Sequence, residues 1–154
     1  MTDNYNYFYD QYYNDIGNLK EQFEKIPNPH IVAIYRGGLP IGVHLSNALK
    51  CPMSIVKYQS RDGEDEKAEW ILNLIHDEKL RPTARFFPHL IVLDDIYDTG
   101  KTFRAVLELP EFENNINYHC IALFGNDNDD KVNYLHEQLY RWIVFPWERV
   151  KGGM

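Results

Sequence analysis

The chain has 154 residues, of which 44% are hydrophobic and 25% charged, with a formal net charge of −7 and a pI near 5.3. This length predicts a single domain over 1–154, and the acidity argues against a nucleic acid or an acidic membrane surface as the partner. No apolar run approaches the ~20 residues that span a bilayer, and no signal-peptide pattern is present, so we expect a cytoplasmic protein with no membrane partner. Cys51 and Cys120 match no metal-binding spacing, and we expect two buried free thiols.

The first predicted element is a helix from about Phe8 to Lys25, which Pro27 and Pro29 end. Its apolar positions recur at steps of three and four residues: Tyr12, Ile16, Leu19, Phe23 and Ile26. The N-terminus is rich in tyrosine. These rings either cover a sheet face from the helix or form a surface for a partner or a second copy of the chain.

Further along the chain, short apolar runs between turn residues predict strands. These runs are 30–35, 53–58, 70–75, 90–95, 117–124 and 142–145. A helix is predicted to begin at Pro40 and another to run from about Lys101 to Leu109, and 132–138 fits either a helix or a strand. Strands that alternate with helices predict an α/β fold, in which a mostly parallel twisted sheet is flanked by helices.

The segment from Leu90 to Thr102, LIVLDDIYDTGKT, carries the clearest chemistry. It predicts a buried strand that ends in Asp94 and Asp95 and is followed by a polar turn that opens a helix. Ligands of open α/β sheets bind at the carboxyl ends of strands. The two carboxylates suit hydroxyl groups or Mg²⁺, while the N–H groups of 98–102 suit a phosphate. The sequence therefore predicts a site for a sugar phosphate.

Three alternatives to this interpretation exist. A P-loop also ends in Gly-Lys-Thr, but its earlier glycine position is occupied by Asp95 here. A receiver-type phosphoacceptor would carry its acidic pair after the first strand, whereas this pair comes late. The simplest alternative is a solvated acidic turn without a ligand.

Two other loops could share the site. Arg36-Gly37-Gly38 follows a buried strand, so its backbone can approach an anion closely while Arg36 donates to phosphate oxygens. In the segment RWIVFPWE, Trp142 could stack on a flat heterocycle and Glu148 could accept from ring N–H groups. The alternatives are an ordinary turn in the first case, and core tryptophans with a surface glutamate in the second.

LIVLDDIYDTGKT resembles the signature of type I phosphoribosyltransferases, the segment that binds 5-phosphoribosyl 1-pyrophosphate. IYRGG resembles the pyrophosphate loop of that family, and WIVFPWE most resembles its small purine enzymes, such as xanthine/guanine phosphoribosyltransferase. The resemblance covers roughly 30–148. It implies the type I fold with a small hood over the base, Mg²⁺ as the cofactor, small-molecule substrates and a homo-oligomer.

The resemblance also implies a role for each motif residue. Asp94 and Asp95 would hold the ribose hydroxyls, directly or through Mg²⁺, and Asp98 would be the candidate general base. The 5′-phosphate would be bound by Asp98, Thr99, Gly100, Lys101 and Thr102. Pyrophosphate would be bound by Arg36, Gly37 and Gly38, after a 35–36 peptide that is often cis in relatives. The base would contact Ile96, Asn126, Trp142, Val144 and Glu148, and 59–69 would be the mobile lid.

Two positions depart from the family pattern. Six-oxopurine enzymes carry a lysine after the strand equivalent to 117–124, where this chain has Asn126, and Val144 replaces an acid of the xanthine enzyme. The predicted function is transfer of the phosphoribosyl group to a purine of the hypoxanthine, guanine or xanthine type, in purine salvage. The alternatives are another base, such as adenine or a pyrimidine, and a nucleotide-binding regulator of the same fold without catalysis.

Overall fold

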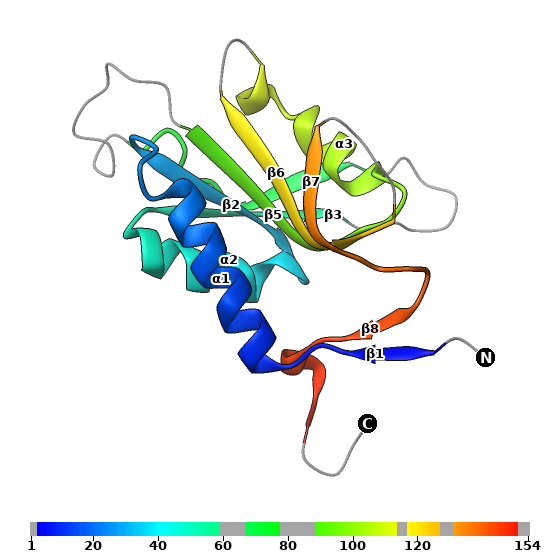
Figure 1. Cartoon of the computed structure of the whole chain (residues 1–154). Coiled ribbons are helices and arrows are strands. Elements are labelled where there is room, and N and C mark those ends of the chain that lie inside the picture. The colour runs from blue at the N-terminus through cyan, green and yellow to red at the C-terminus, as the bar shows by residue number, and fades with distance from the viewer. Residues whose placement is uncertain (1–2, 59–66, 78–88, 114–116, 127–130, 151–154) are drawn as a thin grey trace.

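The computed structural model describes residues 3–58, 67–77, 89–113, 117–126 and 131–150 (Figure 1). Its strands are β1 (Asn4–Asn6), β2 (Pro29–Tyr35), β3 (Met53–Tyr58), β4 (Ala68–Leu72), β5 (His89–Tyr97), β6 (Tyr118–Gly125), β7 (Val132–Glu137) and β8 (Trp142–Val144). Its helices are α1 (Tyr9–Phe23), α2 (Gly38–Leu49) and α3 (Lys101–Leu107), with short 3₁₀ turns η2 (Pro110–Phe112) and η3 (Pro146–Glu148).

The main sheet has six strands in the order β4-β3-β2-β5-β6-β7. Each neighbouring pair is parallel except β3 with β4. The predicted α/β fold with a mostly parallel sheet and flanking helices is therefore confirmed. A second sheet pairs β1 with β8 and lies beyond the ends of β6 and β7 (Figure 1). We call this two-stranded sheet, together with η3, the hood.

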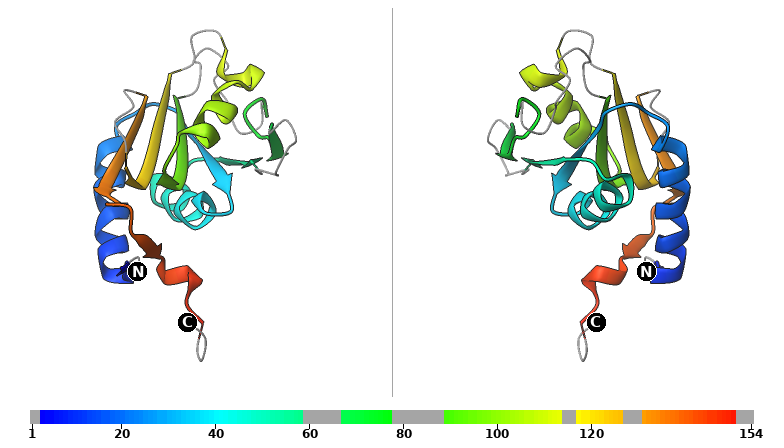
Figure 2. Two further views of the ribbon diagram at one scale, coloured as in Figure 1. Left: turned by 90° about the vertical axis from the view of Figure 1, so that its right-hand side faces the viewer. Right: turned by 90° about the vertical axis from the view of Figure 1, so that its left-hand side faces the viewer.

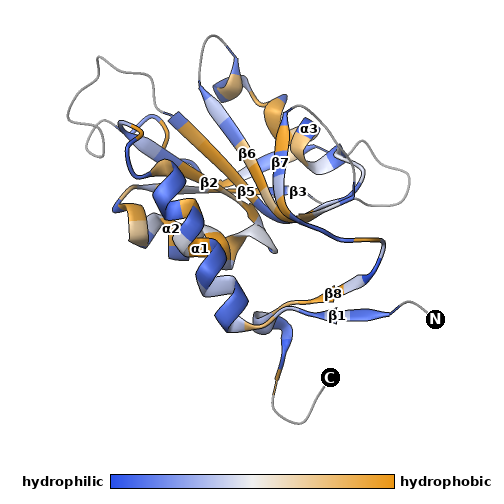
Figure 3. Cartoon of the chain, in the orientation of Figure 1, coloured by the Kyte–Doolittle hydropathy of each residue, from blue (hydrophilic) through white to orange (hydrophobic). Residues whose placement is uncertain are grey.

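Both faces of the main sheet are covered. Helices α1 and α2 lie on one face and α3 on the other, as Figure 2 shows from two sides. Along β5, Ile91 and Leu93 pack in the core under α1 and α2, while Leu90 and Val92 pack in the core under α3. Burial on both faces explains why this strand is a continuous apolar run rather than an alternating one. Accordingly, the hydrophobic colours of Figure 3 gather on the central strands.

Several predicted boundaries change in the structure. The segment with two possible assignments is strand β7, because Val132 to Glu137 pairs with β6. The strand predicted at 70–75 lies at Ala68–Leu72, and the last helix ends at Leu107, shortly before Pro110.

Most of the predicted lid lies outside the described residues. Both cysteines are free, with Cys120 buried and Cys51 half-buried. None of the described helices is long and apolar enough to cross a membrane.

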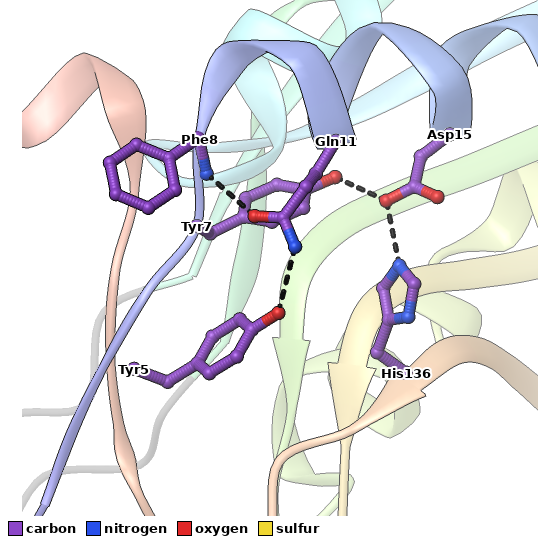
Figure 4. A network of polar contacts seen from close by, with 6 residues as sticks. All are labelled: Tyr5, Tyr7, Phe8, Gln11, Asp15 and His136. Atoms are coloured by element: carbon purple, nitrogen blue, oxygen red, sulfur yellow. Dashed lines mark hydrogen bonds and ion pairs between the residues drawn. The ribbon is translucent and has the colours of Figure 1, made fainter.

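The N-terminal tyrosines divide between the core and the surface. Tyr7 joins the hood to the main sheet: its N–H donates to the carbonyl of Val144 over 3.0 Å, and its hydroxyl donates to Asp15 of α1. The same Asp15 oxygen lies 2.7 Å from Nε2 of His136 on β7 (Figure 4). Tyr12 is also buried, whereas Tyr9 and Tyr13 are exposed. The covering role predicted for these rings therefore holds for Tyr7 and Tyr12.

Candidate active site

The acidic pair lies near the carboxyl end of β5, which continues to Tyr97. Asp94 is buried, and its Oδ1 accepts the backbone N–H of Asp95 over 2.9 Å. Oδ1 of Asp95 in turn accepts the N–H of Ile96 over 2.8 Å. These backbone contacts fix both carboxylates in the middle of the sheet, between β2 and β6.

The electrostatics of this pair are unfavourable without a ligand. Burial raises the pKa of Asp94 well above its usual range, and the neighbouring charge of Asp95 raises it further. Burial likewise raises the pKa of Asp95, with a contribution from the charge of Glu148. A cation or hydroxyl donors beside the pair would remove this penalty.

The donor set fits Mg²⁺ when a substrate supplies the remaining ligands. Among the described residues, no group of three or more His, Cys, Asp and Glu side chains could hold a metal by itself. Mg²⁺ is usually bound by one or two carboxylates together with substrate phosphates and water. Two carboxylates beside a candidate pyrophosphate loop match that pattern.

That loop follows β2 and packs directly against the acids. A Cβ atom at Gly37 would lie 2.2 Å from the carboxyl carbon of Asp95, and one at Gly38 would lie 2.2 Å from the carbonyl oxygen of Leu93. Only glycine therefore allows the 37–38 backbone to approach β5 so closely. The Tyr35–Arg36 peptide bond is cis, as the resemblance implied, and Arg36 is exposed at the loop.

The turn from Tyr97 into α3 needs its glycine for conformation and for space. Gly100 has φ 80, and a Cβ there would lie 2.8 Å from both the Tyr97 hydroxyl and Nη1 of Arg104. Arg104 also donates from Nη2 to the carbonyl of Thr99 over 2.9 Å. Asp98, Thr99 and Lys101 are exposed around this turn, and Thr102 is half-buried. Arg104 was not identified from the sequence. Its position in the first turn of the helix that follows the 98–102 motif could have indicated its contact with Thr99.

Asn126 follows β6 and lies beside the turn. Its Nδ2 is 3.4 Å from Oδ1 of Asp98 and 2.7 Å from Oε1 of Gln138. The structure therefore brings Asp98 and Asn126 together, but it also places the Asn126 amide in contact with protein groups. Sequence reasoning missed Gln138, because only the pairing of β6 with β7 places it next to Asn126.

The hood supplies the remaining candidates. Trp142 and Val144 lie on one face of β8, opposite the buried Ile143, and Trp142 is 63% exposed. Glu148 caps the 3₁₀ turn, since its Oε2 accepts the N–H of Phe145 over 2.9 Å. The charge of Glu148 contributes to the raised pKa of Asp95. Ile96 is half-buried, two residues beyond Asp94 on β5.

Comparison with known proteins places this arrangement in a family. A model of the phosphoribosyl transferase domain matches residues 9–148. The purine phosphoribosyltransferase of Pyrococcus horikoshii Ot3 is 23% identical, with a TM-score of 0.72 and a match over 99% of this chain and 98% of that one. The xanthine-guanine-hypoxanthine phosphoribosyltransferase of Helicobacter pylori is 23% identical, with a TM-score of 0.70 over 95% and 94% of the two chains.

A hypothetical protein from Neisseria gonorrhoeae with bound ppGpp is 20% identical, with a TM-score of 0.69 over 98% and 92% of the two chains. No curated protein matches the sequence. At these identities the solved structures establish the fold alone, whereas the domain model covers nearly the whole chain, from α1 to the end of the hood. The chain therefore belongs to the phosphoribosyl transferase domain family and is a type I phosphoribosyltransferase.

Proposed function

We propose that the protein transfers the phosphoribosyl group of 5-phosphoribosyl 1-pyrophosphate to a purine of the hypoxanthine, guanine or xanthine type, in purine salvage. The products are a nucleoside monophosphate and pyrophosphate. The observation that carries this proposal is the contact of Gly37 with the Asp95 carboxylate, because it sets a candidate pyrophosphate loop against the candidate ribose site.

Each substrate group then has a place among the described residues. Arg36, Gly37 and Gly38 bind the pyrophosphate, Asp94 and Asp95 bind the ribose hydroxyls directly or through Mg²⁺, and the 98–102 turn binds the 5′-phosphate. The base lies between Ile96 and Trp142, with Asn126, Val144 and Glu148 at its edge.

The reaction breaks the bond between ribose C1 and the pyrophosphate oxygen and forms a bond from C1 to a base nitrogen. Positive charge develops on the ribose and negative charge on the leaving group. Mg²⁺, when bound at the acidic pair, would neutralise part of the charge on the pyrophosphate. Arg36 donates to the pyrophosphate oxygens, and Asp98 accepts the proton that the base nitrogen loses.

The choice of a base other than adenine or orotate is supported by the extent of the structural matches. The enzymes from Pyrococcus horikoshii Ot3 and Helicobacter pylori match over more than nine-tenths of both chains. An orotate phosphoribosyltransferase from Aeropyrum pernix matches over 86% and 74%, with a TM-score of 0.57, and an adenine phosphoribosyltransferase from Rhodothermus marinus over 83% and 80%, with a TM-score of 0.61. The hood segment WIVFPWE resembles the purine enzymes as well.

The deciding experiment measures pyrophosphate release from 5-phosphoribosyl 1-pyrophosphate and Mg²⁺ with hypoxanthine, guanine, xanthine, adenine, orotate and uracil in turn. We expect turnover with at least one 6-oxopurine. The double variant Asp94→Asn/Asp95→Asn should lose about 10²-fold or more of it, because pre-organised charge at a reacting centre contributes that much. Glu21→Gln, an exposed carboxylate on α1, is the matched control.

Turnover with adenine or a pyrimidine alone would replace the proposed base. No turnover with any base would favour a nucleotide-binding regulator, and binding of ppGpp, the ligand of the Neisseria protein, would then be the next measurement.

We further propose a cytoplasmic homo-oligomer. Tyr9 and Tyr13 on α1 and Val43 on α2 are exposed. Beside them runs a groove of about 600 Å³, which is lined by Tyr35, Arg36, Leu39, Pro40, Val43, His44 and Asn47. Burial of Tyr9, Tyr13 and Val43 against a second copy would remove apolar surface from water. Light scattering should then show a mass above 18.2 kDa, and Tyr13→Lys with Val43→Lys should return it to that value.

A further inference from the structure

Two amide side chains, Asn126 and Gln138, connect the turn that carries Asp98 to the strand that carries Trp142. Asn126 uses both N–H groups of its amide, one toward Asp98 over 3.4 Å and one toward Oε1 of Gln138 over 2.7 Å. Its own Oδ1 accepts the backbone N–H of Tyr140 over 3.2 Å.

The chemistry of these contacts fixes which way the Asn126 amide points. If its oxygen and nitrogen were exchanged, the oxygen would face two acceptors and the nitrogen would face the N–H of Tyr140. The backbone N–H of Asn126 also donates to the carbonyl of Tyr97 over 3.2 Å, which holds the residue against β5. The side chain is therefore aimed at Asp98 as a donor.

Gln138 holds Asn126 in this orientation. Its Nε2 donates to the carbonyl of Arg141 over 3.0 Å, which leaves Oε1 facing Asn126. Its backbone N–H donates to the carbonyl of Gly125 over 2.9 Å, so the residue is tied to the end of β6. Gln138 is half-buried and does not itself contact Asp98 in the described structure.

The same amides hold an unusual turn. Leu139 and Tyr140 both have positive φ, 56 and 55, which is unfavourable for residues with bulky side chains. The turn is closed by the N–H of Arg141 donating to the carbonyl of Gln138 over 3.2 Å, and by the contact of Tyr140 with Asn126. It leads directly into β8, where Trp142 lies. Strained turns that are held by side chains often place functional groups.

From this arrangement we infer that Gln138, through Asn126, is a positioning residue that orients Asp98 toward the base, an inference that rests on the proposed function. Asp98 is exposed, and among the described residues Asn126 is the side chain that restrains its carboxylate. Without that restraint the carboxylate would rotate freely and would reach the base nitrogen less often. The amide pair also links the position of Asp98 to that of the strand carrying Trp142.

The test compares Gln138→Leu with Gln138→Glu in the full chain. Both variants lose the N–H donor to the Arg141 carbonyl. Glu keeps an oxygen that accepts from Asn126, whereas Leu removes it. The matched control is Gln11→Leu, which removes another hydrogen-bonded amide: Gln11 accepts the N–H of Phe8 and donates to the Tyr5 hydroxyl, both over 3.0 Å.

We expect Gln138→Leu to lower kcat/KM for the base by about 10- to 100-fold, because a small misplacement of a reacting group can lower the rate by up to about 10²-fold. Its KM for 5-phosphoribosyl 1-pyrophosphate should stay within about twofold, because uniform binding of that substrate is not altered. Gln138→Glu should keep kcat/KM for the base within about threefold of wild type, although its thermal midpoint falls together with that of the Leu variant. Gln11→Leu should lower the midpoint and leave kcat/KM unchanged.

Unchanged kcat/KM in Gln138→Leu, or activities that follow the thermal midpoint across all three variants, would overturn the inference. If Gln138→Leu does not fold, Gln138→Met takes its place, since it also removes the oxygen that accepts from Asn126 while keeping the length of the side chain, and it must lower kcat/KM for the base. A wild-type protein that turns over no base is a failure of the proposed function, which the base panel detects before any variant is made.

Discussion

The backbone of Gly37 lies against the carboxylate of Asp95, so closely that a Cβ atom at residue 37 would come within 2.2 Å of the Asp95 carboxyl carbon. Asp95 lies on β5, and Gly37 follows the neighbouring parallel strand β2, whose Ala33 pairs with Leu93 of β5. Each chain segment therefore leaves the sheet at the same edge, and a glycine lets the loop after β2 fold over the acids.

Gly37→Ala should disable catalysis with little loss of folding. The added methyl group would displace the Asp95 carboxylate or the loop, and a misplacement of about 1 Å at a reacting centre can cost about 10²-fold in rate. Steady-state kinetics with the best base of the panel measures this loss. Gly17→Ala is the control: nothing lies within 4 Å of a Cβ there, and the helix α1 should gain about 0.5–1 kcal/mol from it. Wild-type activity in Gly37→Ala would contradict the proposed role of this contact.

Asp94→Asn should stabilise the protein at neutral pH when no ligand is bound. The folded pKa of Asp94 is raised by burial and by Asp95, so between the unfolded pKa of about 3.9 and the raised value the folded state holds more protons. The stability that this protonation contributes is fully present below the pKa of Asp94 in the unfolded chain. It is lost as the pH rises through the pKa of Asp94 in the folded chain.

The wild type should therefore lose stability relative to Asp94→Asn as pH rises. Each tenfold difference between the acid dissociation constants of Asp94 in the folded and unfolded chain corresponds to about 1.4 kcal/mol. Thermal unfolding from pH 4 to 8 measures the difference between the two proteins. Asn can still accept the N–H of Asp95, so the backbone contact is kept. A pH-independent difference would argue that Asp94 is ionised throughout, and Glu21→Gln should show no difference at all.

Arg104→Met should weaken binding of 5-phosphoribosyl 1-pyrophosphate. The Arg104 guanidinium donates to the Thr99 carbonyl and packs beside Gly100, so it supports the turn proposed to hold the 5′-phosphate. Loss of a hydrogen bond from a charged donor costs about 1.5–3 kcal/mol, which corresponds to an increase in Kd of about tenfold or more. Calorimetric titration with Mg²⁺ present checks this, and an unchanged Kd would remove Arg104 from the site.

Tyr7→Phe should loosen the attachment of the hood. Burial and the hydrogen bond to Asp15 raise the pKa of Tyr7 far above its ordinary value, so the hydroxyl remains a donor at every accessible pH. Its removal leaves the buried Asp15 with His136 as partner and should cost about 1–3 kcal/mol. Thermal unfolding should show it, whereas Tyr13→Phe, at a 56% exposed ring, should lie within about 0.5 kcal/mol of wild type.

Trp142→Ala should raise KM for the base by about 5- to 100-fold, since stacking of a base on an aromatic ring is worth about 1–3 kcal/mol. KM for 5-phosphoribosyl 1-pyrophosphate should not change. The ring is 63% exposed, so its loss should hardly affect folding. Ile71→Ala, a 51% exposed residue of β4, is the control. Equal effects on both Michaelis constants would show that Trp142 does not act on the base alone.

The sequence by itself determined the fold class and the three candidate loops. Continuous apolar runs can be buried only inside a covered sheet, and Pro and Gly mark where those runs end. Asp94, Asp95 and the 98–102 turn could be found because their chemistry is local: carboxylates, a glycine and hydroxyls stand in consecutive positions at the end of one strand. The same local information could not choose between helix and strand for β7, since that segment becomes a strand only through pairing with β6.

Tertiary structure alone decided which side chains from distant segments meet. The approach of Gly37 to Asp95 and the contact of Gln138 with Asn126 both depend on strand order and register, which no local pattern contains. Asn126 shows the difference most clearly. The resemblance implied a contact of Asn126 with the base, which stays a prediction, and the folded chain adds contacts of its amide N–H groups with Asp98 and Gln138 that the sequence did not indicate. Residue type limits what an amide can bind, but the neighbours that the fold supplies determine what it does bind.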